Sequence, residues 1–374
     1  MKSFIKKTLV TSVLSLAFVS GCANKTTVPS EEGEKIELVE FNDVVDIHTE
    51  IQSEFILERF DVASEYNIDG KHELSKPLKT TFNRNLKGCD PKDIKYYELK
   101  ISEYEDFKDS KTIKAKSNSA KATNFKIDQK YYWKVIGYKE DREISSPIST
   151  FQTYDEGPRN LDIDGITNVR DLGGYYIDDD KYVKQGLIYR CGRLNYSSVE
   201  QPSIQIGIDG IAEMRDYLKI KSEIDLRMTE DNEVGSIDES PLGSDINYYQ
   251  CPMNYEGNIL LSNKQMVASV FELLGVKENY PLIFHCNIGT DRTGLIAYLL
   301  NGLLGVSESD LILDYEFSNL GNIGGTRQFS RLRSSYVATI GQTEGADLSE
   351  KCENYLLGLG VAQKTIDNIK TILS

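Results

Sequence analysis

One stretch of fourteen residues, Pro281 to Gly294, contains side chains that suit phosphate chemistry. The apolar residues 282–284 at its start predict a short buried strand, and the apolar run from Leu295 to Leu304 predicts a buried helix. The loop between them has Cys286 near one end and Arg292 at the other. Backbone N–H groups in such a loop point toward one place, and the helix N-terminus adds partial positive charge. The loop is therefore expected to bind an anion, with phosphate the best fit.

Cys286 and Arg292 have different chemical uses in such a loop. The positive field lowers the pKa of the Cys286 thiol, so a thiolate is expected at neutral pH. The planar guanidinium of Arg292 matches two oxygens of a phosphate group. Taken singly, a Cys after a strand is usually a small buried apolar residue. The loop also contains Gly, Asp and Thr, and this combination favours the chemical interpretation.

The segment resembles the signature loop of the cysteine-dependent tyrosine phosphatases, His-Cys-x5-Arg-Ser/Thr-Gly, which here runs from His285 to Gly294. Three motifs precede it in the expected order: Asn168-x-Arg-Asp-x-Gly-Gly174, Tyr189-Arg190 and Asp225-Leu-Arg227. Together with Asp314-Tyr315 they resemble the bacterial secreted and lipoprotein tyrosine phosphatases, over roughly residues 158–373. This resemblance implies an α/β phosphatase domain with a central sheet flanked by helices. The alternation of predicted strands and helices indicates the same fold class, with a site at the strand C-termini.

The resemblance also implies a role for each residue of the loop. Cys286 is expected to attack phosphorus and form a phosphocysteine, and Thr293 to donate its hydroxyl to the departing thiolate. Backbone N–H groups and the Arg292 side chain are expected to bind the phosphate oxygens. The implied substrate-binding residues are Asn287, Ile288, Gly289, Thr290, Asp291 and Arg292. No metal or other cofactor is implied, and the chain contains only three His.

Protonation of the leaving oxygen requires a general acid. The sequence has no Trp-Pro-Asp motif, and its single Trp, Trp133, lies outside the phosphatase region. The resemblance implies that the Asp before the loop Arg, Asp291, serves as the acid. Asp225 is a second candidate, although its place in an Asp-Leu-Arg motif also suits it to brace the loop through Arg292. Asp245, in a connecting segment, is a third candidate.

Three residues are expected to support the loop: His285, Asp225 and Arg170. By analogy His285 lies behind the loop, and the alternative is a hydrogen-bonded buried His with no chemical role. Arg170, Arg190 and Arg193 either line the entrance to the site or form ordinary structural ion pairs. The sequence leaves both alternatives open.

Position 290 bears on the substrate. Many relatives have Ala-Gly-Lys-Asp-Arg in the loop, where this chain has Ile-Gly-Thr-Asp-Arg at residues 288–292. In those relatives the loop Lys suits a second phosphate on the substrate. Because this chain has Thr290 instead, phosphotyrosine in proteins or peptides is favoured as the substrate. A phosphoinositide or dual-specificity phosphatase is the first alternative. The second is a catalytically silent surface protein that binds phosphate or adheres to a partner.

The N-terminus predicts export. Three lysines in the first seven residues precede a short apolar run at residues 8–19. The sequence Val-Ser-Gly-Cys that ends at Cys22 resembles a bacterial lipobox. Residues 1–21 are therefore predicted to be a lipoprotein signal peptide, with Cys22 lipidated and residues 22–35 a tether. The predicted location is the cell membrane, lipid-anchored and extracytoplasmic; an ordinary secretory signal is the alternative.

The composition excludes some partners. The chain has 374 residues, enough for two or three domains, and a formal net charge of −15. It has no basic excess to neutralise phosphates, so no nucleic-acid partner is expected. Six Cys are present. Apart from Cys22 and Cys286, their spacings match no disulfide or zinc framework, and scattered thiols are expected.

The first half of the chain has a β pattern. Residues 36–155 contain short alternating segments separated by polar turns, with 96–101, 122–127 and 131–136 among the predicted strands. The Tyr-x-Trp-x-Val strand, followed by a turn and a last strand, resembles a fibronectin type III or Ig-like module. An all-β sandwich is therefore expected before a phosphatase domain at 158–374. A family-specific β extension is the alternative, and the partner of the module is unknown.

The sequence predicts two helical features in the second domain. Ser262 and Gln265 predict a capping box before an amphipathic helix that starts near Met266. The apolar spacing from Tyr355 to Leu373 predicts a helical closing region.

Overall fold

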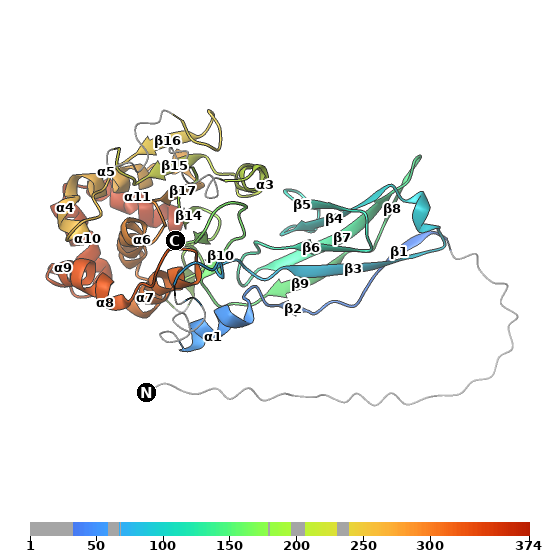
Figure 1. Cartoon of the computed structure of the whole chain (residues 1–374), viewed down its shortest axis with the longest axis horizontal. Helices are drawn as coiled ribbons and strands as arrows, with labels where there is room; N and C mark the ends of the chain where they lie inside the picture. Colours follow the sequence, from blue (N-terminus) through green and yellow to red (C-terminus); the bar gives the residue numbers. More distant parts are fainter. Residues whose placement is uncertain (1–32, 59–66, 68, 179, 196–205, 230–238) are drawn as a thin grey trace, which may run out of the picture.

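The computed structural model describes residues 33–58, 67, 69–178, 180–195, 206–229 and 239–374. A β module and an α/β body lie end to end along the long axis of the molecule (Figure 1). The predicted signal peptide, Cys22 and residues 22–32 of the predicted tether lie outside the described residues. In the part of the chain that is described, no helix combines the length and apolar character needed to span a membrane.

The β module (residues 35–45 and 80–153) contains two sheets. The three-stranded sheet has the order β1 (Lys35–Leu38), β3 (Thr80–Lys87) and β6 (Ser119–Ala122). The second sheet has the order β2 (Val44–Val45), β9 (Ser149–Thr153), β7 (Lys130–Tyr138), β4 (Tyr96–Ser102) and β5 (Lys111–Ala115), with β8 (Glu143–Ser145) paired to β7. The sheets share an apolar core, in which the ring of Phe82 from β3 lies 4.9 Å from that of Trp133 from β7.

The strands predicted at 96–101 and 131–136 are confirmed as parts of β4 and β7. The strand predicted at 122–127 is wrong, because β6 ends at Ala122 and Asn124 has a left-handed φ of 69°. The polar strand β3 went unpredicted because only Phe82 and Leu86 interrupt its polar residues. A helix, α1 (Glu50–Glu58), follows β2, so the N-terminal half is not wholly β. The fibronectin or Ig-like resemblance stays a prediction.

The α/β body (residues 159–374) is built on a six-stranded sheet. Its order is β10 (Arg159–Asn160), β11 (Arg170–Asp171), β14 (Ile188–Cys191), β17 (Leu282–His285), β15 (Ser222–Asp225) and β16 (Asn247–Gln250). β10, β11 and β14 pair antiparallel, and the pairs from β14 to β16 are parallel. The expected α/β phosphatase architecture is thus present, with a mixed sheet. A small hairpin pairs β12 (Tyr176–Asp178) with β13 (Lys181–Tyr182).

Helices cover both faces of this sheet. The larger core lies on the face of α5 (Lys264–Leu274), α6 (Asp291–Leu304), α10 (Leu348–Gly358) and α11 (Gln363–Leu373). The other face packs on α3 (Ile208–Ala212) and the π-helical turn Glu213–Tyr217. The remaining described helices are α4 (Ile259–Ser262), α7 (Glu308–Phe317), α8 (Phe329–Leu332) and α9 (Ala338–Gly341). Short 3-10 or π turns adjoin several of these helices.

The structure refines the two helical predictions. The closing region is two helices rather than one, because α10 ends at Gly358 and α11 begins at Gln363, with Gly360 between them at φ 93°. The capping box at Ser262 is wrong. Ser262 is the last residue of α4, and Asn258 caps that helix by accepting a hydrogen bond from the N–H of Leu261. No side chain caps α5.

A buried arginine joins the β module to the α/β body. Arg159 donates from Nε to the carbonyl of Phe125 and from Nη2 to the carbonyl of Asn124, each at 3.0 Å. Its Nη1 pairs with Asp171 of β11. Asn124 in turn donates to Glu213 Oε1 at 2.6 Å. The left-handed turn at Asn124 therefore forms part of the interface between the two bodies.

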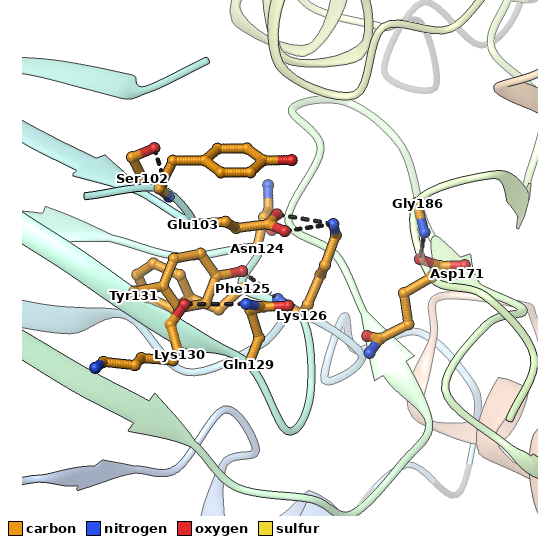
Figure 2. A network of polar contacts seen from close by, with 12 residues as sticks. Ser102, Glu103, Asn124, Phe125, Lys126, Gln129, Lys130, Tyr131, Asp171 and Gly186 are labelled. Atoms are coloured by element: carbon orange, nitrogen blue, oxygen red, sulfur yellow. Dashed lines mark hydrogen bonds and ion pairs between the residues drawn. The ribbon is translucent and has the colours of Figure 1, made fainter. Parts of the chain in front are cut away.

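Figure 2 shows the polar contacts on both sides of this junction. On the β-module side, Lys126 pairs with Glu103 at 2.8 Å, and its N–H donates to the Tyr131 hydroxyl at 2.8 Å (Figure 2). On the other side, Asp171 accepts from the N–H of Gly186 at 2.6 Å. These contacts order the two surfaces that meet at the junction.

The bonds that cross the junction include those of Arg159 and those of Ile127, whose N–H donates to Gln185 Oε1 at 2.9 Å and whose carbonyl accepts from Gln185 Nε2 at 2.8 Å. Breaking such bonds without replacement costs free energy, so they hold the two bodies together.

Candidate active site

The signature loop lies between the central strand and a buried helix. β17 ends at His285 and α6 begins at Asp291, so residues 286–290 form the loop. The N–H groups of residues 287–291 donate to no acceptor in the described part of the chain. Unsatisfied N–H groups beside the start of a buried helix need an acceptor. An anion bound next to Cys286 would supply it.

The carbonyl groups of the loop, by contrast, are hydrogen-bonded from outside. Asn168 donates to the carbonyls of Ile288 at 3.2 Å and Gly289 at 3.1 Å. Arg190 donates to the Gly289 carbonyl at 2.7 Å. The loop peptides are therefore oriented with their carbonyls bound to the body and their N–H groups unpaired. This orientation is the one that anion binding requires.

Asp314 of α7 fixes two arginines behind the loop. It accepts from Arg170 Nε at 3.0 Å and pairs with Arg190. All three side chains are buried. Burial opposes the charge of Asp314, but Arg190 and Arg170 outweigh it and lower the pKa of this carboxyl group. Of the two alternatives for Arg170 and Arg190, the structural ion pair is therefore the one observed.

The loop also approaches the neighbouring strand closely. Gly289 has φ 71°, and a Cβ there would lie 2.3 Å from the carbonyl oxygen of Cys191, so only Gly fits. Next to it, the N–H of Arg193 donates to the Asn287 carbonyl at 3.1 Å, and the Arg193 guanidinium donates to Asn287 Oδ1. Arg193 is buried, so it holds the loop and does not line an open entrance.

Cys286 is buried and directly follows the last residue of β17. Burial raises the pKa of its thiol, but Arg292 and the hydroxyl and N–H of Thr293 outweigh burial, and the pKa falls below 9.0. The Thr293 hydroxyl is buried and finds no other partner among the described residues. It is thus available to the sulfur, as the sequence predicts.

Arg292 is held by backbone carbonyls. Its Nη1 donates to the carbonyls of Met253 at 3.1 Å and Leu226 at 3.3 Å, and its guanidinium carbon lies 5.3 Å from the ring centroid of Tyr255. The expected brace from Asp225 to Arg292 is wrong. The Asp225 carboxylate pairs with Arg227 instead, and only the carbonyl of the intervening Leu226 reaches Arg292.

His285 lies behind the loop, as expected. Its Nε2 contacts Glu223 Oε1 at 2.9 Å and its Nδ1 contacts the Cys286 carbonyl at 3.1 Å. Burial lowers the pKa of His285, but Asp225 and Glu223 outweigh it and raise the pKa above 6.5. A protonated imidazole can donate to both oxygens, which fixes the start of the loop.

His285, Glu223 and Asp225 also have possible metal-ligand atoms within 4.8 Å of one another. However, Asp225 also accepts from the guanidinium of Arg227 at 2.6 Å. A cation already pairs with this carboxylate, and its hydrogen bonds keep it ionised. Asp225 is fully buried and both of its carboxylate oxygens accept from Arg227, so it is a structural anion.

Asp291 lies at the first residue of α6, at the edge of the loop. Its Oδ1 accepts from the Tyr315 hydroxyl at 3.3 Å and lies 3.4 Å from Arg331 Nε. Its Oδ2 lies 3.4 Å from Arg327 Nε. Its side chain is 15% exposed. Asp245, the third candidate acid, instead pairs with Arg215 and is 67% exposed.

Four residues that contribute to this site were not predicted from the sequence. Asn168 was part of a quoted motif, but its bonds to the loop were not foreseen; its φ of 60° is a local signal of a special role. Glu223 precedes Asp225 by two residues and so shares its face of β15. Arg327 and Arg331 had no signal, because the segment around them matches none of the motifs.

The model of the tyrosine phosphatase family matches residues 161–374, which is more than half of the chain. The chain therefore belongs to the tyrosine phosphatase family, whose members are phosphatases of the cysteine-dependent type.

Individual relatives agree with this assignment. A Cupriavidus necator protein, whose name assigns it provisionally to the tyrosine-protein phosphatases, is 27% identical over 212 residues, which are 50% of this chain and 71% of that protein. A tyrosine-protein phosphatase of Nostoc commune is 27% identical over 128 residues, which are 28% of this chain and 42% of that protein.

Among solved structures, the core catalytic domain of the PP-IP phosphatase SIW14 from S. cerevisiae, in complex with citrate, has a TM-score of 0.29 and 18% identity. The match covers 41% of this chain and 84% of that domain. A score this low says nothing about the substrate.

Proposed function

We propose that this protein is a protein-tyrosine phosphatase that acts through a phosphocysteine intermediate. One observation supports the proposal above others: the loop carbonyls are hydrogen-bonded from outside, while the N–H groups of residues 287–291 next to Cys286 have no partner among the residues that the structure describes. The three nonbridging oxygens of a phosphate ester, which become equatorial in the transition state, fit such a set of donors. Thr290 is buried, and its hydroxyl bonds to the Ile288 carbonyl, so no loop cation favours a second phosphate.

The proposed reaction has two steps. The Cys286 thiolate attacks phosphorus, the bond to the leaving oxygen breaks, and Asp291 gives its proton to that oxygen. Water then attacks the phosphocysteine and gives a proton to the Asp291 carboxylate, the S–P bond breaks, and inorganic phosphate leaves. The Thr293 hydroxyl stabilises the thiolate in this second step. Arg292 and the loop N–H groups hold the equatorial oxygens throughout.

A substrate with a second anionic group is the other candidate. The Arg331 side chain is 57% exposed and lies 3.4 Å from Asp291, so it brings a positive charge to the edge of the site. A guanidinium there suits the further phosphate of a phosphoinositide. Replacing Arg331 by Ala would lower turnover of such a substrate by a larger factor than that of a phosphotyrosyl peptide.

The test compares p-nitrophenyl phosphate, a phosphotyrosyl peptide, a phosphoseryl peptide and a phosphoinositide. The purified full chain is assayed in reductant and EDTA, beside Cys286→Ser. Metal-independent turnover that disappears in the variant, and is fastest on the phosphotyrosyl peptide, is the expected result. No turnover by folded, reduced protein would reject the enzyme and favour a phosphate-binding or adhesive module. Faster turnover of the phosphoinositide would favour the second candidate.

We also propose that Cys22 carries a lipid that anchors the protein outside the cell. The charged, apolar and Cys-containing order of residues 1–22 supports this proposal. Cys22→Ala should move the protein from the membrane fraction to the soluble fraction and remove the acyl mass from the N-terminal peptide. An unchanged distribution with no acyl mass in the native protein would contradict it.

A further inference from the structure

The chain before the β-module strand β3 packs on the α/β body, outside the residues that match the family. This N-terminal segment comprises residues 46–58, 67 and 69–75, and includes α1. Figure 1 shows α1 beside α7, although more than 200 residues separate them in sequence. The ring centroids of Phe55 in α1 and Phe317 in α7 are 5.9 Å apart, and both side chains are buried in a small cluster with Leu313 and Leu320.

Backbone hydrogen bonds bind the same segment to the chain that follows α7. The N–H of Leu74 donates to the Leu320 carbonyl at 2.7 Å. The carbonyls of Gly70 and Asp69 accept from the N–H groups of Gly324 and Gly325, each at 2.9 Å. This pairing is tight, because a Cβ on Gly70 would lie 2.3 Å from the Gly325 nitrogen.

Asn67 is the most connected side chain of the segment. It is fully buried, and its Nδ2 donates to the Asn319 carbonyl at 2.8 Å and to the Gly321 carbonyl at 3.1 Å. Its Oδ1 accepts from the N–H of His72 at 3.0 Å. One amide thus fixes the turn after α7 to the N-terminal segment.

From this turn the contacts continue to the active site. The Asn319 side chain accepts from the Arg327 N–H at 2.6 Å and donates to the Arg327 carbonyl at 2.7 Å. Arg327 Nε lies 3.4 Å from Asp291 Oδ2. A short chain of contacts therefore runs from Asn67 through Asn319 and Arg327 to the carboxyl group at the loop.

We propose that the N-terminal segment belongs to the catalytic unit and that Asn67 is a positioning residue, which holds Arg327 against Asp291. The inference rests on the proposed function, because it assigns Asp291 the proton transfer. It gives the N-terminal segment (residues 46–58, 67 and 69–75) a role in catalysis, although the segment lies outside the residues that match the family. The role is to direct the Asp291 carboxyl group toward the leaving oxygen.

The test uses Asn67→Ala in the full chain, with two phosphate esters. Phenyl phosphate has a basic leaving group that needs a proton, whereas 2,4-dinitrophenyl phosphate has a weakly basic one that does not. We expect kcat to fall about tenfold on the first and less than about twofold on the second, as for partial loss of a general acid. Hydrogen exchange of residues 318–331 should become faster in the variant.

Matched variants separate the possible results. Asn85→Ala, at an exposed site on β3, should change neither measurement. Asp291→Asn should show the same split between the two esters more strongly. If Asn67→Ala fails to fold, Phe55→Leu is expected to show the split in a weaker form. An equal fall on both esters, or unchanged exchange at 318–331, would overturn the proposal. Lack of turnover by the wild type would instead reject the proposed function, and exchange alone would then decide whether the segments are coupled.

Discussion

Aromatic rings fill the space between the two sheets of the β module, whereas charged side chains lie behind the phosphate loop of the α/β body. In the module, Phe41 and Phe82 stack with ring centroids 4.8 Å apart, and Trp133 is fully buried beside them. Behind the loop, Arg190 and Asp314 are buried and paired. Apolar contacts are not directional, but hydrogen-bonded ion pairs fix atoms in place. The first core stabilises a fold, and the second also sets the geometry of a site.

Breaking the charged core should have the largest effect. Asp314→Asn leaves Arg170 and Arg190 buried without their anion, and we expect a loss of about 3 to 5 kcal/mol in the free energy of unfolding. The Gly289 carbonyl loses its fixed donor, so kcat should also fall, by about a hundredfold. Urea unfolding and steady-state kinetics measure the two effects. Asp245→Asn, at an exposed ion pair, is the control. Equal losses of stability and kcat in the two variants would contradict the special role of the buried ion pairs.

Breaking the apolar core should lower stability alone. Leu99 is fully buried in β4, and Leu99→Ala should cost about 2 to 5 kcal/mol in unfolding free energy. Because no directional contact to the loop is lost, kcat per folded molecule should be unchanged. The two quantities are measured as for Asp314→Asn. A parallel fall in kcat would show that the module also sets the geometry of the site.

A smaller effect is expected when one hydrogen bond to Cys286, in the phosphate loop, is removed. The Thr293 hydroxyl lowers the pKa of Cys286, so Thr293→Ala should raise that pKa. The midpoint of the pH dependence of alkylation by iodoacetamide should lie below that of an ordinary cysteine thiol in the wild type and move upward in the variant. Loss of one charge-assisted hydrogen bond should lower kcat about tenfold. Thr371→Ala, exposed on α11, is the control. An unchanged midpoint in Thr293→Ala would contradict the proposed effect of the Thr293 hydroxyl on the pKa of Cys286.

The sequence predicts the local parts of the site better than its distant contacts. Cys286, Arg292 and the strand and helix around them lie within a short stretch, so their types and spacing suffice. The partners of Asp314 lie 144 and 124 residues away, at Arg170 and Arg190, and no local pattern specifies such pairing. Asn124 shows the same limit in the β module. Its segment has a strand-like composition, but its side chain and carbonyl instead contact the α/β body.

The end-to-end arrangement of the two bodies has a consequence for reach. Figure 1 shows β1 starting at the end of the β module that is remote from the α/β body. A nine-residue strand such as β7 extends about 30 Å. Because Arg159 and its neighbours clamp the module to the enzyme, the module acts as a spacer of fixed length and direction. With the proposed anchor at Cys22, this rigid module would add its own length to the tether and keep the phosphate loop away from the membrane surface.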